Sequence, residues 1–464
     1  MTETPTARLD PAVLRLAGIL VLGVLAPLLD STIVNIAIHT LAVELDTTVS
    51  VIQWVSTAYL LGLAAAIPIT GWAVERFGAK RMWIAALLLF LVGSALCGMA
   101  WDVGSLIAFR AVQGVGGGLM LPILQTLLLR AAGGRQLGKL MSVVTLPVLV
   151  GPILGPVIGG LIVGNLSWRW IFYVNLPLGI AAVALAWWAL PADSRGRVQR
   201  LDLVGLLLLS PSFAALLYGL SQVGVQGRFD APEVLVPVLV GALLLVTFVV
   251  RAVRVPGPLI DLTLFGNRSF AASSALLFLS GLSLFGPMLL LPIYYQDARG
   301  LGVIAAALML VPQGLGSLLA RMAGTLTDRI GPRPVVLGAI ALSTLGTVPF
   351  ALGTADTSYW LLGAGLVLRG IGLSAANLAV MVGAYRGLDR EQIPHASSTT
   401  RIMQQIGASL GTAVLAVILQ RELLAQPVVA VAFGHAFWWA VAFAALAVVP
   451  ALLLPRQPDD RLAA

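Results

Sequence analysis

The hydrophobic positions of this chain form long uninterrupted runs that are separated by short polar loops. Apolar runs of about 18 residues or more recur from end to end, and each is long enough to cross the hydrocarbon core of a bilayer as a helix. The alternation of polar and apolar residues that marks a transmembrane strand is absent. The pattern therefore predicts an all-α polytopic membrane protein.

Breaking these runs at their loops gives fourteen predicted transmembrane helices. The expected bounds are 13–38, 51–73, 82–100, 103–129, 139–164, 169–190, 203–221, 233–252, 270–293, 302–325, 335–353, 358–385, 398–420 and 428–455.

The composition agrees with this class, because 59% of the residues are hydrophobic and only 10% are charged. An ordinary soluble domain has about 25% charged residues. The net charge of +8 does not indicate nucleic-acid binding, since 22 of the 28 basic residues, Arg401 among them, lie in loops on one predicted side. Four lie on the other side, and Arg110 and Arg369 fall inside spans. Positively charged loops mark the cytoplasmic side, so both termini are expected in the cytoplasm.

Two motifs occur twice in the same order along the chain. The segment GWAVERFGAKR (71–81) precedes FRAVQGVGGGL (109–119), and GTLTDRIGPRP (324–334) precedes LRGIGLSAAN (368–377). The duplication predicts two pseudo-symmetric six-helix bundles with two additional helices inserted between them. Two related halves that meet near the bilayer midplane are the build of a secondary transporter. The predicted divisions are 1–192 for the first bundle, 193–257 for the inserted helices and 258–464 for the second bundle.

Three further segments strengthen the assignment to one family. They are LLDSTIVNIAI (28–38), GPILGPVIGG (151–160) and WRWIFYVNLP (168–177). Together with the duplicated motifs they resemble the major facilitator superfamily, specifically its fourteen-span drug:proton antiporter branch. The resemblance covers nearly the whole chain. It implies a multidrug efflux transporter of the bacterial inner membrane, which works by alternating access and confers antibiotic resistance.

Asp30 is the only acidic residue well inside a predicted span, and an ionised carboxylate is costly there unless it is paired. Arg110 lies at a similar depth, since each residue is roughly 11–12 Å from the expected outer end of its helix. If the two helices are neighbours, as in the resembled fold, Asp30 and Arg110 can meet and couple transport to protonation. The structural alternative is a permanent salt bridge that only fixes helix packing.

Two segments are expected to control gating. In GPILGPVIGG the glycines recur every fourth residue and form a smooth stripe, while the prolines bend the helix. The resemblance places this segment between the bundles at the outer end, and static close packing is the alternative. For the loop motif, the resemblance implies an acid that engages a helix end of the opposite bundle. The expected gating residues are Gly71, Glu75, Arg76, Gly78, Lys80, Arg81, Gly151, Pro152, Gly155, Pro156, Gly159, Gly160, Asp328, Arg329 and Gly331.

Polar and aromatic residues near mid-span are candidates for a substrate cavity. Gln113 and Asn377 could equally join helices by hydrogen bonds. Arg369 faces a span without any acid, so we expect it to bond backbone carbonyls or hydroxyls, with a substrate anion as the alternative. The expected cavity residues are Asn35, Tyr59, Gln113, Phe285, Met288, Gln313 and Asn377.

The sequence also disfavours several function classes. No G-x-x-x-x-G-K-[ST] segment occurs, which disfavours ATP-driven transport. With three histidines and one cysteine, neither a metal cluster nor a hydrolytic triad is evident, so we expect no enzyme, no metal and no cofactor. We predict a monomeric, proton-coupled exporter of hydrophobic small molecules or drugs, cationic ones included, whose partners are protons and the lipid bilayer. A dedicated carrier of one endogenous metabolite or lipid and a non-transporting sensor are the alternatives.

Overall fold

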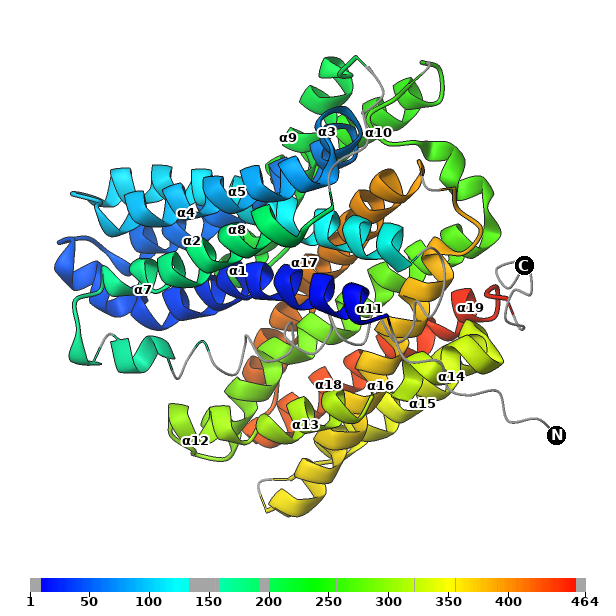
Figure 1. The fold of residues 1–464 in the computed structure, drawn as a ribbon. Helices are drawn as coiled ribbons and strands as arrows, with labels where there is room; N and C mark the ends of the chain where they lie inside the picture. The colour runs from blue at the N-terminus through cyan, green and yellow to red at the C-terminus, as the bar shows by residue number, and fades with distance from the viewer. Residues whose placement is uncertain are drawn as a thin grey trace.

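The computed structural model describes residues 10–132, 155, 158–162, 164–191, 200–255, 257–320, 322–354, 356–389 and 391–455. Within these residues the protein is helical and contains no strand. The helices form two groups, which we call the N-terminal and C-terminal bundles, with a helical hairpin beside them (Figure 1).

The N-terminal bundle contains α1 (Pro11–Glu44), α2 (Val49–Ala66), the 3-10 helix η1 (Ile67–Ile69), α3 (Thr70–Phe77), α4 (Ala79–Gly98), α5 (Val103–Ala132), α7 (Trp170–Tyr173) and α8 (Asn175–Ala189). The hairpin consists of α9 (Leu203–Gln226) and α10 (Pro232–Ala252). The C-terminal bundle contains η2 (Leu262–Gly266), α11 (Arg268–Ile293), the π-helix η3 (Tyr294–Ala298), α12 (Val303–Leu308), α13 (Val311–Leu319), α14 (Met322–Ile330), α15 (Pro332–Ala351), α16 (Tyr359–Tyr385), α17 (Ile393–Ala425), α18 (Val429–Leu446) and α19 (Val448–Ala451).

Among the described residues, twelve helical segments are long and apolar enough to cross a membrane. They match twelve of the fourteen predicted spans, and the count of fourteen is not confirmed. The predicted span 139–164 lies mostly outside the described residues. The predicted span 302–325 is divided into α12, α13 and α14, each too short to cross a bilayer alone. The division before α13 coincides with Pro312, which stands in the first turn of that helix, where the missing N–H is tolerated.

Two glycine turns reveal the internal duplication. Gly78, between α3 and α4, has φ +94°, and Gly331, between α14 and α15, has φ +85°. L side chains rarely adopt this backbone conformation, so each copy of the loop motif needs glycine there. We call the end of the molecule where these turns lie the Gly78 face. The opposite end, where Trp101 joins α4 to α5, is the Trp101 face.

Glycines let α5 approach its two neighbours closely. A Cβ on Gly62 of α2 would overlap the carbonyl oxygen of Ala111, and a Cβ on Gly114 would overlap the carbonyl oxygen of Tyr59. On the other side of α5, a Cβ on Gly93 of α4 would lie 2.6 Å from the Gln113 Cα. Backbone contact of this kind is how small residues join helices in a membrane. It sets the position of α5 between α2 and α4.

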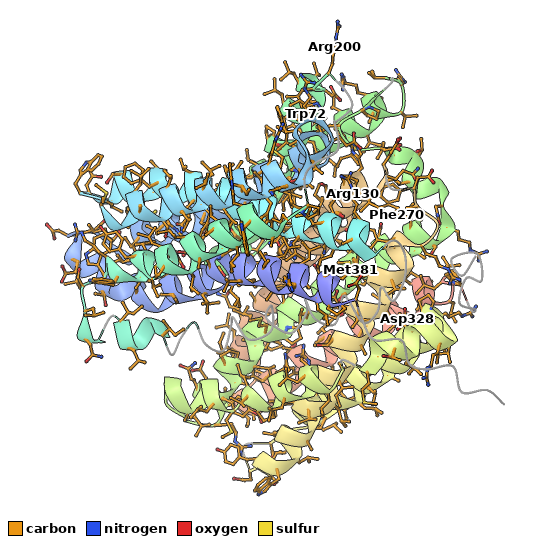
Figure 2. The ribbon with its side chains drawn as sticks, in the orientation of Figure 1. Trp72, Arg130, Arg200, Phe270, Asp328 and Met381 are labelled. Carbon is orange, nitrogen blue, oxygen red and sulfur yellow. The ribbon has the colours of Figure 1, made fainter. Side chains whose placement is uncertain are left out.

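The α9–α10 hairpin contacts both bundles. On the N-terminal side, Ser210 of α9 donates a hydrogen bond to the Ala65 carbonyl at 2.8 Å. Trp72 of α3 (Figure 2) packs on a hydrophobic cluster that includes Leu209 and Phe213 of α9. On the C-terminal side, Ile402 of α17 is buried in the same cluster. At the Gly78 face, Asp202 caps the first turn of α9 and pairs with Arg251 of α10 at 2.8 Å. The hairpin therefore lies along α2 and α17, as one unit.

Helix α17 begins at Ile393, well before the expected start at 398. Arg401, which we expected in a loop, therefore lies inside the helix, about 12 Å along its axis. The Ser-Ser-Thr-Thr segment before it has the composition of a loop. Within α17 the hydroxyls of Ser398, Thr399 and Thr400 instead donate to carbonyls one turn earlier, which satisfies them without leaving the helix.

The packing of α2 on α5 predicts the effect of one added methyl group. Gly62→Ala should destabilise the protein by about 1–3 kcal/mol, because the new Cβ overlaps the Ala111 carbonyl and forces the helices apart. The measurement is the midpoint of thermal unfolding in detergent. Gly338→Ala is the matched control, since nothing lies within 4 Å of its ideal Cβ. Equal shifts for the two variants would contradict the close approach of α2 and α5.

The cap of α9 predicts a pH-dependent contribution to stability. Burial alone would raise the pKa of Asp202, but hydrogen bonds from Arg251 and the Gly205 N–H outweigh it and lower that pKa. Such a carboxylate stabilises the fold above its unfolded pKa, about 3.9, and loses this effect as the pH falls through the folded pKa. Asp202→Ala should therefore cost about 1–2 kcal/mol at pH 7. Asp230→Ala, which breaks an exposed pair, should change the unfolding midpoint little.

Candidate functional site

The Asp30 carboxylate lies on α1 and is completely buried. It accepts hydrogen bonds from Arg110 Nη1 at 2.5 Å and from Gln113 Nε2 at 3.0 Å, both on α5. A third comes from Asn175 Nδ2 of α8 at 2.9 Å. These donors replace the water that a carboxylate loses on burial, and Arg110 supplies a full counter-charge. The structure thus brings Asp30 and Arg110 together, as their depths along the sequence predicted.

Arg110 has several partners besides Asp30. Its Nε donates to the Val55 carbonyl of α2 at 3.2 Å, and its Nη1 donates to Gln113 Oε1 at 2.8 Å. The guanidinium lies 4.3 Å from the centre of the Tyr59 ring, a cation–π contact. Only 1% of the Arg110 side chain is exposed. The cation is therefore solvated by protein groups from α1, α2 and α5.

A second layer of polar residues supports this cluster, and we did not predict it. Asn175 also donates to Ser94 Oγ at 3.1 Å, and Ser94 donates to the Phe172 carbonyl at 2.8 Å. Cys97 Sγ lies 3.6 Å from Gln113 Oε1. Asn175 belongs to the WRWIFYVNLP segment, where it is the only strongly polar residue after Arg169. A lone amide in an apolar segment indicates a buried hydrogen bond, and we did not use that signal.

Three of the expected cavity residues belong to this part of the molecule. Tyr59 and Gln113 are buried members of the Asp30 cluster, so in this structure they do not line an open cavity. Gln113 joins α5 to α1, which was the alternative for that residue. Asn35 is part of α1, and its side chain lies outside the described part of the structure.

The remaining cavity candidates lie in the C-terminal bundle, near Arg369. Phe285 and Asn377 are half-buried and Met288 is exposed. Gln313 Oε1 accepts a hydrogen bond from Arg369 Nη1 at 2.7 Å, so it is engaged with that cation. Arg369 Nη2 donates to the Ser283 carbonyl at 3.1 Å. Arg369 is buried, and no carboxylate pairs with it in the described residues.

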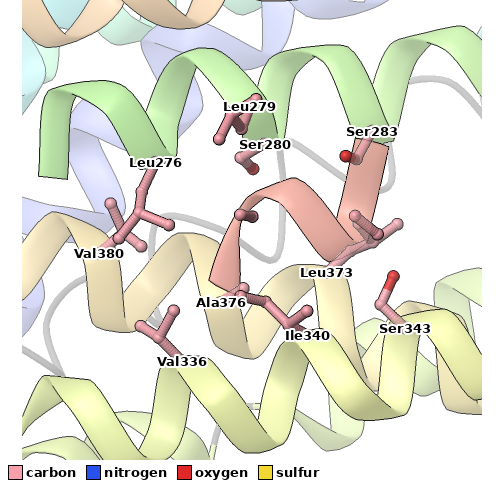
Figure 3. Close-up of a pocket in the computed structure, with 12 residues that line it drawn as sticks. Leu276, Leu279, Ser280, Ser283, Val336, Ile340, Ser343, Leu373, Ala376 and Val380 are labelled. Carbon is pink, nitrogen blue, oxygen red and sulfur yellow. The ribbon is translucent and has the colours of Figure 1, made fainter. Parts of the chain in front are cut away.

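A small pocket opens one helical turn from Arg369, between α11, α15, α16 and α18 (Figure 3). Leu276, Ile340 and Leu373 give it an apolar lining, and Ser280, Ser283 and Ser343 add hydroxyl groups. Because the four helices all belong to the C-terminal bundle, this pocket is separate from the Asp30 cluster.

The two bundles meet at the Gly78 face through a contact between Glu75 and His395. Glu75 Oε1 of α3 lies 3.2 Å from His395 Nε2, in the first turn of α17. His395 Nδ1 lies 3.2 Å from the Leu259 carbonyl. Both ring nitrogens thus face an acceptor, so whichever nitrogen carries a proton has an oxygen to donate to. A Cβ on Gly71 would lie 3.0 Å from His395 Nδ1, so Gly71 leaves room for the ring.

Uncharged hydrogen bonds extend this junction. Thr126 Oγ1 of α5 donates to Ser397 Oγ of α17 at 3.4 Å, and the Tyr385 hydroxyl of α16 donates to Gln125 Oε1 at 3.2 Å. Met381 lies in the same region, between the bundles (Figure 2), with its sulfur 4.0 Å from Gln125 Nε2. Every hydrogen bond and ion pair known between the bundles in the described residues is at this face.

The other expected gating residues of the loop motifs are nearby but do not all join the bundles. Lys80 donates to the Leu190 carbonyl at 2.7 Å, a contact within the N-terminal bundle. Arg76 and Arg81 are exposed. Gly331 forms the second turn, and Asp328 and Arg329 lie on α14 just before it (Figure 2). Of the loop-motif residues, Glu75 has a known contact with the other bundle, through His395.

The glycine stripe is described only in part. Gly151, Pro152 and Pro156 lie outside the described residues. The atoms nearest to a Cβ on Gly155 belong to Thr32 and Ile33, and those nearest to a Cβ on Gly159 belong to Ile33. Nothing lies within 4 Å of a Cβ on Gly160. For Gly155 and Gly159 the contact is therefore with α1 of the same bundle, and the expected seam between the bundles is not seen at these positions.

Comparison with known proteins shows which protein family the sequence resembles. The sequence profile of the Major Facilitator Superfamily matches residues 20–412. The chain is 38% identical to the "Multidrug resistance protein B homolog" of Mycobacterium tuberculosis over 429 residues, which cover 92% of this chain and 79% of that protein. It is 32% identical to the "Putative multidrug resistance protein MdtD" of Cronobacter sakazakii, covering 95% of this chain and 94% of that protein.

A solved structure shares the fold. The proton:xylose symporter XylE, described as a major facilitator superfamily protein, superimposes with a TM-score of 0.64 at 13% identity, covering 94% of each chain. At this identity the likeness supports the fold alone. The profile match and the sequence relatives show more: this chain belongs to the major facilitator superfamily, a family of membrane transporters and not of enzymes.

Proposed function

We propose that this protein exports hydrophobic small molecules in exchange for protons, and that Asp30 is the group that carries the proton. The observation that carries the proposal is the fully buried Asp30 carboxylate, which is held by Arg110, Gln113 and Asn175. Ionisable residues in the membrane interior are costly and mark ion pathways. The names of the two relatives, which refer to multidrug resistance, favour drugs over one endogenous metabolite as substrates.

Protonation of Asp30 removes the negative charge that Arg110 faces. Arg110 then keeps the Val55 carbonyl, Gln113 Oε1 and the Tyr59 ring as partners. The buried cation is therefore solvated by the protein in both protonation states, which limits the cost of breaking the ion pair. Because the donors to Asp30 come from α5 and α8, gain of a proton changes the contacts among three helices. We infer that protonation of Asp30 changes the packing of the N-terminal bundle in this way.

The bundle junction supplies the gate in this scheme. We assign the Gly78 face to the cytoplasm, so that the Glu75–His395 contact closes the cytoplasmic end while the outer end admits protons. The excess of basic residues in loops at that face supports the orientation, with both termini in the cytoplasm and the protein in the bacterial inner membrane. A proton that enters across 100 mV supplies about 2.3 kcal/mol to the cycle.

We further propose fourteen membrane crossings, divided into bundles over 1–192 and 258–464 and an insertion over 193–257, in a monomer. The described residues before and after 133–154 support this count, because α5 ends at the Gly78 face while Arg169 donates to the Ala100 carbonyl at the Trp101 face. Helices α12, α13 and α14 together have the length of one further crossing.

Replacing the proposed proton carrier tests the mechanism. Asp30→Asn should abolish flux that is driven by a pH gradient, because an amide cannot bind and release a proton, while gradient-independent exchange of substrate continues. The measurement uses proteoliposomes with an imposed pH gradient and three fluorescent probes: ethidium, 1-pyrenebutanol and 1-pyrenebutanoate. The panel makes the result independent of substrate charge.

A double variant separates this role from a purely structural one. Asp30→Asn leaves Arg110 buried without its counter-charge, which can cost about 3–5 kcal/mol. Asp30→Asn combined with Arg110→Gln removes both charges and relieves that cost. If Asp30 carries the proton, the double variant remains uncoupled. If it regains gradient-driven flux, the ion pair is structural and the proposed proton site is wrong.

The gate can be tested by accessibility. Ser397 is buried in the junction, and the natural cysteine Cys97 is buried elsewhere. In a Ser397→Cys background, Glu75→Gln should raise the rate of thiol labelling about tenfold, because a hydrogen bond to a carboxylate contributes about 1.5–3 kcal/mol. Arg254→Gln removes an exposed charge just after α10 at the same face and should leave the rate unchanged. Equal rates in the Glu75 and Arg254 variants would exclude a gating role for Glu75.

A further inference from the structure

Arg401 is a cation without a known counter-charge at the boundary between the bundles. It lies inside α17 and is half-buried. Its known hydrogen bond goes to Gln404 Oε1, one turn away on the same helix, at 3.0 Å. Among the described residues no carboxylate forms an ion pair with it. The role of this charge is not explained by helix packing or by the junction.

The neighbours of Arg401 place it just inside the closed end. Ser397 lies one turn before it on the same face of α17, and contacts Thr126 of α5 and Tyr385 of α16. Arg401 therefore lies one turn further toward the Trp101 face, beyond the layer that joins the bundles. Ile402, the next residue of α17, is buried in one hydrophobic cluster with Ala64 and Ile67, so the N-terminal bundle borders this turn of α17 on the other side.

The surrounding charges leave the membrane interior positive. Arg369, on α16, is a second buried arginine without a carboxylate in the described residues, and it is held only by Gln313 and the Ser283 carbonyl. The interior acid, Asp30, is fully buried and already accepts three hydrogen bonds. Its charge is matched by Arg110. A cation that entered between the bundles beside Arg401 would thus meet a positive charge that no carboxylate of the described residues pairs with.

We infer that the transported hydrophobic molecules are organic anions, and that Arg401 binds their acidic group. This inference rests on the proposed function and names its substrate class. A guanidinium presents parallel N–H donors that match a carboxylate or sulfonate. A charge without a counter-charge in the membrane interior is costly, and an anionic substrate would supply the counter-charge. The expected substrates combine an apolar ring system with one anionic group.

The inferred charge also suits the direction of transport. Export of an anion and entry of a proton both move charge in the direction that an inside-negative membrane potential favours. Export of a cation would work against that potential. The substrate and the proton occupy separate sites in this scheme, since Arg401 lies on α17 and Asp30 lies on α1. Tyr59 of α2 contacts Arg110, the partner of Asp30.

Three probes with the same apolar body test the inference. They are 1-pyrenebutanoate, 1-pyrenebutanol and 1-pyrenebutylamine, which carry a negative charge, no charge and a positive charge near neutral pH. In proteoliposomes with an imposed pH gradient, the wild-type protein should transport the anion with the lowest KM. Arg401→Gln should raise the KM for the anion about tenfold, the loss of one charged hydrogen-bonding pair. Transport of the alcohol should change less than twofold.

Control variants separate binding from folding. Arg401→Lys keeps the charge but loses the parallel N–H donors, so it should restore the anion transport in part. A purely structural role of the guanidinium would give no such rescue by lysine. Arg421→Gln removes an exposed arginine of the same helix and should have no effect. An unchanged KM for the anion in Arg401→Gln would overturn the role of Arg401.

The outcomes also distinguish this inference from the function it rests on. Gradient-driven transport of the amine with exclusion of the carboxylate would overturn the anion class and leave proton-coupled export standing. Absence of gradient-dependent flux for every pyrene probe and for ethidium would contradict the proposed function itself.

Discussion

The structure of the N-terminal bundle depends on keeping one carboxylate satisfied away from water. Asp30 needs donors from more than one helix, and α5 and α8 provide them only if they approach α1 closely. The position of α5 is in turn set by the glycines at its contacts with α2 and α4. The glycine-rich sequence after Arg110 and the buried charge are therefore parts of one arrangement, because larger side chains there would carry Arg110 and Gln113 away from Asp30.

The two bundles use the same framework for different purposes. Arg110 and Arg369 occupy corresponding motifs, and in each bundle the guanidinium bonds a glutamine and a backbone carbonyl. An aspartate completes the first arrangement, whereas the described residues provide none for the second. The two halves thus share the helices and the arginine, and they differ in the charge that the arginine faces.

Much of the fold was predictable because membrane helices can be recognised in a sequence by their length and hydrophobicity. The pairing of Asp30 with Arg110 was predictable for a related reason: two isolated charges at equal depth have few other ways to be satisfied. Asn175 was not, because a single amide at a helix start is common and its partners come from distant segments. Arg401 was misplaced because a Ser/Thr-rich helical turn resembles a loop in composition. The division of residues 303–330 into three helices depends on tertiary packing that hydropathy does not report.

The α9–α10 hairpin has a consequence for how lipid-dissolved molecules reach the protein. Helix α9 runs along both α2 and α17, from the Ser210–Ala65 hydrogen bond to the stacking of Tyr218 on Trp54 at 5.4 Å and the contact between Gly227 and Gln420. It therefore covers the line where the two bundles adjoin on that flank. A hydrophobic molecule diffusing within the bilayer therefore meets the wall of a helix on this flank, and direct lateral access to the boundary between the bundles is blocked there.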